Sequence, residues 1–278
     1  MGRMVKTVWG DELVIESREV IKFGVLSAIL SMFLDAAMGH GLFWRNDPYW
    51  TYWITDAFLI TTITCLGISL IGLGIWQGFV IIAVQALVLE IYYEFLSPVG
   101  LPQAPYWLSF YDIWTTGLGV HFLVYLSGFL LALWIWRRKK RNKDLLATTQ
   151  PWKIAVYTLF SALGIILLDG LVTHYLLINQ YPGFTFFLQR LILTFVFLYA
   201  WNSYVGIDLK GIISGAVLLS LLWLTYNMYL GPVGLPGKHP IFFDYDELWF
   251  KIFPGALVST FVGLFVGKWF NPGRPGAA

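Results

Sequence analysis

Ionisable side chains inside long apolar stretches are the feature of this sequence most capable of chemistry. In the first half of the chain they are Asp35, Asp56, Glu90, Glu94, Asp112 and His121. Such groups cost roughly 3 kcal/mol or more at bilayer depth, and they usually face a protein interior, where they mark proton relays, ion pathways or substrate sites. Three interpretations remain open: a metal site, an acid–base site, and a hydrogen-bond network that only fixes helix packing.

Glu90, Glu94 and His121 are the candidate metal ligands. Glu90 and Glu94 are four residues apart and share one face of a helix. Carboxylate and imidazole groups bind iron, zinc, manganese or copper, and Asp35 or Asp56 could complete the coordination. No dense ligand motif such as His-x-x-x-His accompanies them in the sequence. The cofactor is therefore unassigned, with a transition metal as one candidate.

Asp35, Asp56 and Glu90 are the candidate catalytic residues. A carboxyl group in a low-dielectric pocket favours the neutral acid, which can protonate an alkene or a carbonyl group. Glu90 is the best candidate for the proton donor. Asp35 and His40 are five residues apart, about 140° around an α-helix, so we do not expect them to chelate one metal ion as neighbours on one face.

The composition indicates which elements hold these residues. Of the 278 residues, 58% are hydrophobic and 12% are charged, and the mean hydropathy is +0.69, whereas a soluble domain has about 25% charged residues. A water-soluble monomer, a disordered chain and a collagen-like chain are therefore excluded. The apolar stretches are continuous rather than alternating, which favours helices over a membrane barrel. The predicted fold is an all-α polytopic membrane helical bundle.

Eight apolar stretches predict eight transmembrane helices, since about 20 residues of helix cross a bilayer. They cover residues 21–43, 51–72, 75–96, 113–136, 153–178, 185–205, 211–230 and 249–270, with a turn at 72–74. The expected organisation is a cytoplasmic N-terminal segment 1–20, a first four-helix repeat 21–136, a basic cytoplasmic linker 137–152, a second four-helix repeat 153–270 and a C-terminal tail 271–278.

A run of basic residues after the fourth helix predicts the orientation. The run consists of Arg137, Arg138, Lys139, Lys140, Arg141 and Lys143, and short loops rich in Lys and Arg stay in the cytoplasm. Both termini are then cytoplasmic, in the plasma or inner membrane of the cell. The ionisable groups form a belt in the outer part of that membrane. A short run directly after a span indicates a solvated loop and argues against nucleic-acid binding.

The two halves of the chain share a pattern that indicates internal duplication. Residues 97–102 read SPVGLP and residues 231–236 read GPVGLP, which is a shift of 134 residues. At the same shift the matched pairs are Asp35 with Asp169, His40 with His174, and Asp56 with Arg190. Each repeat has an even number of helices, so the two repeats would run parallel, related by an axis along the membrane normal.

The two repeats differ in their ionisable residues. The positions that correspond to Glu90, Glu94 and His121 hold Leu224, Met228 and Ala256, and Arg190 reverses the charge of Asp56. This divergence suggests one active half and one supporting half.

Several residues between positions 44 and 117 have a suggestive spacing. They are Trp44, Arg45, Trp50, Gly78, Glu90, Pro105 and Gly117. With these residues the stretch resembles the membrane subunits of copper monooxygenases that act on methane or ammonia. The resemblance covers a minor part of the chain, and the two four-helix repeats depart from that family. It adds to the metal interpretation and does not identify the chain.

The sequence predicts an integral membrane enzyme, or the subunit of one, with metal-dependent redox chemistry as one option. It would act on a small or hydrophobic substrate at an outward-facing intramembrane polar pocket. A proton- or cation-coupled transporter and a non-catalytic scaffold subunit of a membrane complex are the alternatives, so enzymatic activity itself is left open. The expected partners are the lipid bilayer, the substrate and other membrane subunits, and nucleic acid is not among them.

Overall fold

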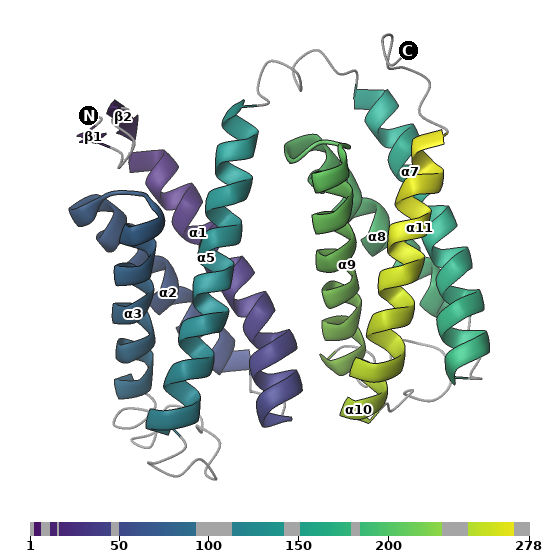
Figure 1. The fold of residues 1–278 in the computed structure, drawn as a ribbon, viewed down its shortest axis with the longest axis horizontal. Helices are drawn as coiled ribbons and strands as arrows, with labels where there is room; N and C mark the ends of the chain where they lie inside the picture. The colour runs from purple at the N-terminus through teal and green to yellow at the C-terminus, as the bar shows by residue number, and fades with distance from the viewer. Residues whose placement is uncertain are drawn as a thin grey trace. The chain divides into compact units, whose positions relative to one another are not determined.

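Apolar helices make up almost the whole of the described chain (Figure 1). The computed structural model describes residues 3–6, 12–15, 17–45, 50–92, 113–141, 151–178, 184–229 and 244–269. The α-helices are α1 (Ser17–Leu34), α2 (Trp50–Ile71), α3 (Ile75–Ile91), α5 (Leu118–Arg141), α7 (Pro151–Asp169), α8 (Phe184–Tyr204), α9 (Leu209–Tyr229), α10 (Tyr245–Glu247) and α11 (Phe253–Trp269). Four further segments are π-helical: η1 (Asp35–Trp44), η4 (Ile113–Gly117), η5 (Gly170–Ile178) and η6 (Leu248–Ile252).

A short β-hairpin precedes the first helix and departs from the all-α prediction. It pairs β1 (Arg3–Lys6) antiparallel with β2 (Glu12–Ile15). Because a two-stranded hairpin is at best marginally stable by itself, it adds little to the fold.

Seven helices of the described residues are long and apolar enough to cross a membrane. They are α1 with η1, α2, η4 with α5, α7 with η5, α8, α9, and α10 with η6 and α11. The predicted polytopic helical bundle is therefore confirmed. The apolar α3 has 17 described residues and falls just below the required length, so the count of eight spans stays a prediction.

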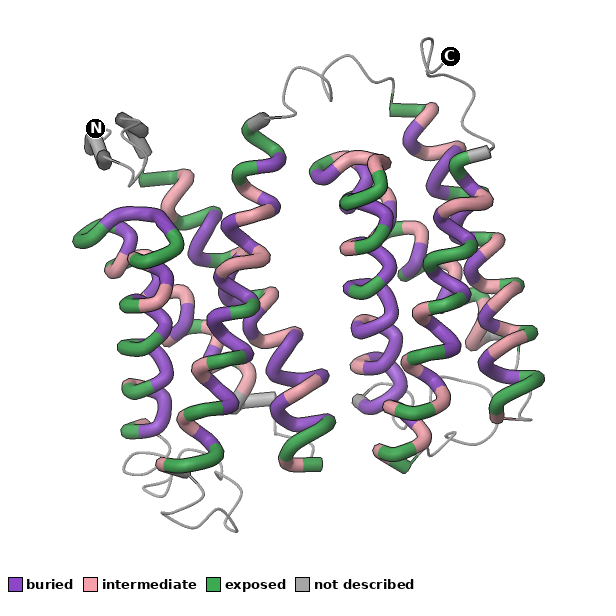
Figure 2. The backbone as a smooth tube through the Cα atoms, in the orientation of Figure 1, coloured by how far each residue is buried: buried purple, intermediate pink, exposed green. Residues whose placement is uncertain are grey.

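Large apolar side chains are exposed along these helices, as expected for surfaces that face lipid. Buried and exposed stretches alternate along the helices (Figure 2). The most exposed apolar side chains include Phe58, Leu70, Trp76, Leu167, Phe184 and Phe250. In water these residues would form unfavourable contacts, but in a bilayer they contact acyl chains at no such cost.

The chain divides into two compact units, Met1–Trp136 and Arg137–Ala278, and the division falls at the predicted end of the first repeat. In the first unit α1 packs closely on α5, where Ser31 Oγ donates a hydrogen bond of 3.4 Å to the backbone oxygen of Tyr125. Gly78 of α3 leaves room for the ring of Phe129 on α5. Small residues thus let these helices approach closely.

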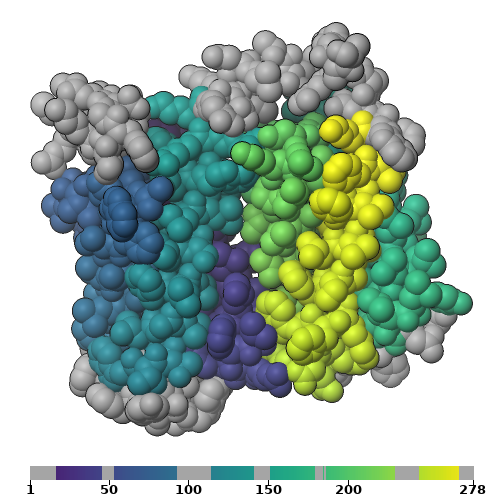
Figure 3. Space-filling model, in the orientation of Figure 1, coloured from purple at the N-terminus to yellow at the C-terminus, as the bar shows by residue number. Residues whose placement is uncertain are grey.

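The second unit uses the same kind of packing between its own helices. On the face drawn in Figure 3, α11 lies between α9 and α7. Tyr157 Oη donates a hydrogen bond of 3.1 Å to the backbone oxygen of Leu264, which ties α7 to α11. The apolar core of this unit consists of Ile165, Leu198, Ile212, Ala216, Leu219, Trp223, Tyr226, Ala256 and Leu264.

Special backbone conformations occur at corresponding positions of the two units. The π-helical η1 begins at Asp35 and η5 begins directly after Asp169, while η4 and η6 have 5 residues each. Gly72, with φ 98°, ends α2, and Gly206, with φ 92°, follows α8. Only glycine adopts such angles without strain. These matches support the duplication, which stays a prediction.

Candidate functional site

A change of helix type brings Asp35 and His40 together in the first unit. The helix that begins as α1 becomes the π-helical η1 at Asp35. A π-helix forms i→i+5 hydrogen bonds, so residues five positions apart lie one turn apart on the same side. Asp35 Oδ2 lies 3.4 Å from His40 Nε2, and both side chains are buried. The α-helical geometry assumed for these two residues is therefore wrong, whereas the expectation that they do not chelate one metal ion stays a prediction.

Glu90 and His121 form a short polar contact inside the first unit. His121 Nδ1 and Glu90 Oε1 are 2.5 Å apart, and both side chains are buried. Glu90 lies in the last turn of α3, and His121 lies in the first turn of α5. A carboxylate that accepts the Nδ1 proton fixes both the orientation and the tautomer of the ring.

Asp56 of α2 joins the same cluster through Tyr125. Tyr125 Oη donates a hydrogen bond of 3.5 Å to Asp56 Oδ2. The ring of Tyr125 also stacks on His121, with 5.3 Å between the ring centroids. Asp35, Glu90 and Asp56 all interact electrostatically with His121. The three candidate catalytic carboxylates therefore lie around one imidazole.

Trp44, the last residue of η1, lies between the two imidazoles of the cluster. Its ring centroid is 5.0 Å from that of His40 and 4.8 Å from that of His121. Gly39 provides the space for this arrangement. A β-carbon at Gly39 would meet Asp35 Oδ1 and would lie 3.0 Å from the Trp44 ring. The cluster is thus acidic, buried and partly walled by aromatic rings.

The corresponding cluster of the second unit contains its own cation. Arg190 Nη1 donates a hydrogen bond to Asp169 Oδ2 and lies 2.9 Å from His174 Nε2. Thr173 Oγ1 donates a hydrogen bond of 2.6 Å to Asp169 Oδ1. The arginine therefore compensates the charge of the aspartate inside the unit. Asp169 and Arg190 thus form a buried ion pair.

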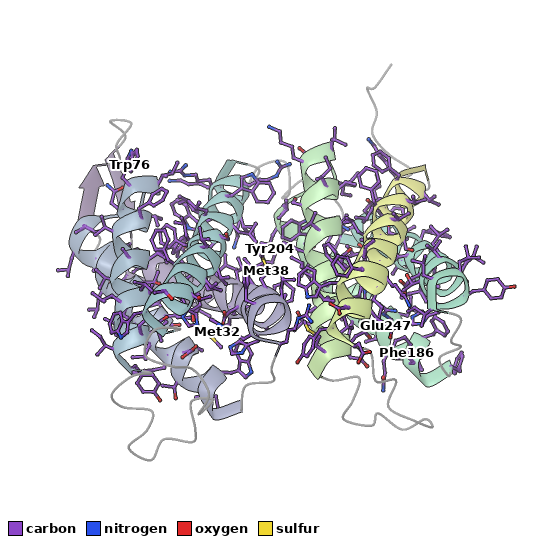
Figure 4. All side chains as sticks on the ribbon, turned by 60° about the horizontal axis from the view of Figure 1, so that its bottom comes forward. Met32, Met38, Trp76, Phe186, Tyr204 and Glu247 are labelled. Carbon is purple, nitrogen blue, oxygen red and sulfur yellow. The ribbon has the colours of Figure 1, made fainter. Side chains whose placement is uncertain are left out.

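Aromatic rings cover the buried guanidinium group of Arg190. The carbon at its centre lies 4.3 Å from the ring centroid of Trp223 and 5.2 Å from that of Phe186, which is labelled in Figure 4. A cation over an aromatic face is attracted by the negative face of the ring. The side chain is fully buried, so these rings replace the water that would otherwise solvate it.

The structure brings together most of the predicted site residues, but it does not test the predicted metal ligands as a set. Asp35, Asp56, Glu90 and His121 lie in one cluster, whereas Glu94 is outside the described residues. Across the part of the chain that is described, no three His, Cys, Asp or Glu side chains converge to hold a metal ion. The metal site stays a prediction.

Three members of the cluster were not among the site residues predicted from the sequence. His40 was matched to His174 by the repeat, and that match was the available signal for a role in the site. Trp44 was noted only in the resemblance to copper monooxygenase subunits, and its position beside His121 depends on the π-helical turn. Tyr125 was likewise missed, since one tyrosine in an apolar helix resembles many interfacial aromatic residues.

Comparison of the chain with protein-family models, with curated proteins and with solved structures found no match. The resemblance to copper monooxygenase subunits stays a prediction from the sequence. The candidate site is therefore argued from its own geometry.

Asp208, in the connection between α8 and α9 and outside the candidate spans, forms an ion pair with Arg138. Arg138 Nε also donates a hydrogen bond of 2.7 Å to the backbone oxygen of Val205. Burial by itself raises the pKa of Asp208, but hydrogen bonds from Arg138 and from the backbone N–H of Gly211 outweigh this effect and lower the pKa below its usual range. Asp208 also caps the first turn of α9 through Gly211.

Proposed function

We propose that the chain is an integral membrane enzyme, or the membrane subunit of one, in which Glu90 and His121 exchange a proton with a small or hydrophobic substrate. The observation that carries this proposal is the 2.5 Å contact between Glu90 Oε1 and His121 Nδ1 inside a bundle of apolar helices. When Glu90 accepts the Nδ1 proton, the basic atom of the ring is Nε2. A carboxylate-oriented imidazole of this kind is suited to general acid–base catalysis.

Asp35 and Asp56 supply the electrostatic environment for this exchange. Both carboxylates act on His121, and negative charge nearby stabilises the imidazolium that forms when the ring takes up a proton. In this scheme the two aspartates assist His121 rather than react with the substrate. The predicted role of Glu90 as the proton donor then becomes that of a partner that shares its proton with the ring.

The proposal includes the predicted placement in a cell membrane with both termini in the cytoplasm. The basic run that begins at Arg137 supports that orientation. The substrate would then reach the cluster from the outer side of the membrane. If a transition metal takes part, Glu90, Glu94 and His121 are its proposed ligands.

Proton-coupled transport is the second candidate. The number of buried ionisable side chains in the first unit favours it. Its buried ionisable side chains, among the residues described, are three carboxylates and two imidazoles: Asp35, Asp56, Glu90, His40 and His121. Chains of buried carboxylates and histidines carry protons in pumps and transporters. The other alternative, a scaffold subunit, requires no chemistry from these groups.

Infrared difference spectroscopy during a pH titration tests the proposed proton exchange. The full chain would be purified and placed in lipid nanodiscs. We expect one carboxyl signal to disappear in Glu90→Gln, and the same signal to titrate at a different pH in His121→Ala. Glu247→Gln is the matched control, because Glu247 forms a 2.9 Å ion pair with Lys251 away from the cluster. An unchanged titration in both cluster variants would leave only the scaffold alternative.

Two further measurements distinguish enzymatic activity from transport and test whether a metal takes part. Proteoliposomes that contain a pH-sensitive dye report proton flux, and flux that is lost in Glu90→Gln would favour transport over enzymatic activity. Elemental analysis of the purified chain reports bound metal. A stoichiometric transition metal that is lost in Glu90→Ala would favour the metal-dependent version.

A further inference from the structure

Contacts between helices bring several helix ends together at one end of the second unit. Arg138 Nε, near the end of α5, donates a hydrogen bond of 2.7 Å to the backbone oxygen of Val205, in the turn between α8 and α9. Near the end of α8, Asn202 Nδ2 donates a hydrogen bond of 3.2 Å to Thr158 Oγ1 of α7. The start of α7 and the end of α11 lie at this same end of the unit (Figure 1).

Basic side chains gather at these helix ends, which we call the basic end of the second unit. Those that the structure describes are Arg137, Arg138, Lys139, Lys140, Lys153, Lys210 and Lys268. Among the described carboxylates of this unit, only Asp208 lies here, and it forms an ion pair with Arg138. The others lie at the end of α7, in α10 or in the residue before α10, at the opposite end of the unit. The basic end therefore has more positive charge than its described carboxylate balances.

Three lysines of the basic end are available to a partner. Lys139, Lys210 and Lys268 are exposed, and none of them forms an ion pair with a described residue. Each lies at or next to the end of a candidate membrane span. Lipid headgroups lie at the ends of transmembrane helices, and lysine side chains extend to that level. The three ammonium groups are therefore at the depth of phospholipid phosphates.

Exposed apolar side chains continue from these lysines towards the middle of the helices. Leu209, directly before Lys210, is 56% exposed, and Ile213, one turn further along the same face of α9, is 46% exposed. Lys139 Nζ lies 4.6 Å from the ring centroid of Tyr204, which is half-exposed and is labelled in Figure 4. A phospholipid offers a phosphate to the lysines and acyl chains to the apolar side chains, whereas a free phosphate ion offers only the first.

We propose that the basic end of the second unit is a binding surface for anionic phospholipids. Lys139, Lys210 and Lys268 attract the headgroup phosphates, and the outward apolar face of α9 contacts the acyl chains. Each lysine or arginine near an anionic membrane surface makes a favourable contribution to such binding, and salt weakens it. Arg138 is not part of this surface, because its charge is balanced by Asp208. The surface does not depend on proton exchange at Glu90 and His121, so either proposal can fail while the other stands.

Native mass spectrometry of the full chain in detergent tests the surface. The probes are phosphatidylglycerol and phosphatidylcholine with identical acyl chains, added in equal amounts. Phosphatidylglycerol should bind at least roughly fivefold more tightly, and the preference should shrink as the concentration of ammonium acetate is raised. Inorganic phosphate at the same concentration should not displace the lipid, because it has no acyl chains. Equal affinity for the two lipids, or displacement by inorganic phosphate, would overturn the proposal.

Variants of the three lysines locate the effect. Replacing Lys139, Lys210 and Lys268 together by glutamine should remove most of the preference for phosphatidylglycerol, whereas replacing the same three by arginine should retain it. Because these side chains are exposed, neither variant removes a buried contact. Lys251→Gln is a second control, since Lys251 pairs with Glu247 at the opposite end of the unit. An unchanged preference in the glutamine variant, or an equal loss in the arginine variant, contradicts the surface.

Discussion

Asp35 Oδ2 and His40 Nε2 lie 3.4 Å apart, although five positions separate the two residues, because the helix changes from α to π at Asp35. Asp169 Oδ2 and His174 Nε2 show the same relationship at 3.6 Å. An aspartate and a histidine five positions apart are thus within reach of one another in both units. This spacing would separate them in an α-helix, so the π-helical segments are what assemble the two clusters.

The contact between Glu90 and His121 should contribute to the free energy of unfolding. His121→Ala leaves the Glu90 carboxylate buried without its imidazole, which should lower the free energy of unfolding by about 3 to 5 kcal/mol. Glu90→Gln should cost less, because the amide still hydrogen-bonds the ring. Denaturant unfolding in detergent measures both variants. Leu123→Ala, at a side chain that is 62% exposed, serves as the control, and an equal loss in all three would contradict the contact.

The ion pair between Arg190 and Asp169 should be strongly coupled. Arg190→Met removes the only cation that the described structure places on Asp169 and should cost about 3 to 5 kcal/mol. Adding Asp169→Asn should recover part of that loss, because the amide is neutral. A double-mutant cycle on unfolding free energies measures the coupling. Strictly additive losses would show that the two side chains do not depend on each other.

Gly39 should be intolerant of a side chain. In Gly39→Ala the new β-carbon would meet Asp35 Oδ1 and the Trp44 ring, so we expect a loss of about 1 to 3 kcal/mol from overpacking. Gly119→Ala is the matched control, because a β-carbon there meets nothing within 4 Å. It should be neutral or should stabilise its helix by up to about 1 kcal/mol. Similar results for both variants would refute the packing around Gly39.

The ion pair of Asp208 predicts a dependence of stability on pH. Its pKa is lower in the folded chain than its usual 3.8, so the ion pair stabilises the fold above that pH. The contribution is lost as the pH falls through the folded pKa. Because the side chain is 42% exposed, we expect less than about 1 kcal/mol. Thermal unfolding of wild type and Asp208→Asn should converge in acid and differ near neutral pH.

The membrane-spanning architecture could be predicted because apolar length and glycine turns leave strong signals. The turn at Gly72 was visible in the sequence. Glu90 and His121 were grouped as metal ligands, which stays a prediction, and the two side chains are in contact, since ionisable residues in apolar stretches are few and tend to face one another. The N-terminal hairpin was missed, because its strands are short and most of the chain is helical.

The detailed geometry of the site could not be predicted, because it depends on a departure from α-helical periodicity. A helical wheel with 3.6 residues per turn separates Asp35 from His40. The residues of η1 do not by themselves predict a π-helical turn. The same turn determines where Trp44 lies, so its contact with His121 was equally hidden.

The tight turns at Gly72 and Gly206 have a consequence for biogenesis. Only residues 72–74 connect α2 to α3, and residues 205–208 connect α8 to α9. A connection of so few residues does not allow one helix to insert into the bilayer while the next helix remains in the aqueous phase. The pair α8 and α9 should therefore enter the lipid as one helical hairpin, and α2 and α3 should do the same if α3 spans the membrane. Lengthening either turn with a glycosylatable or charged loop would convert that step into two and would expose any half-inserted state.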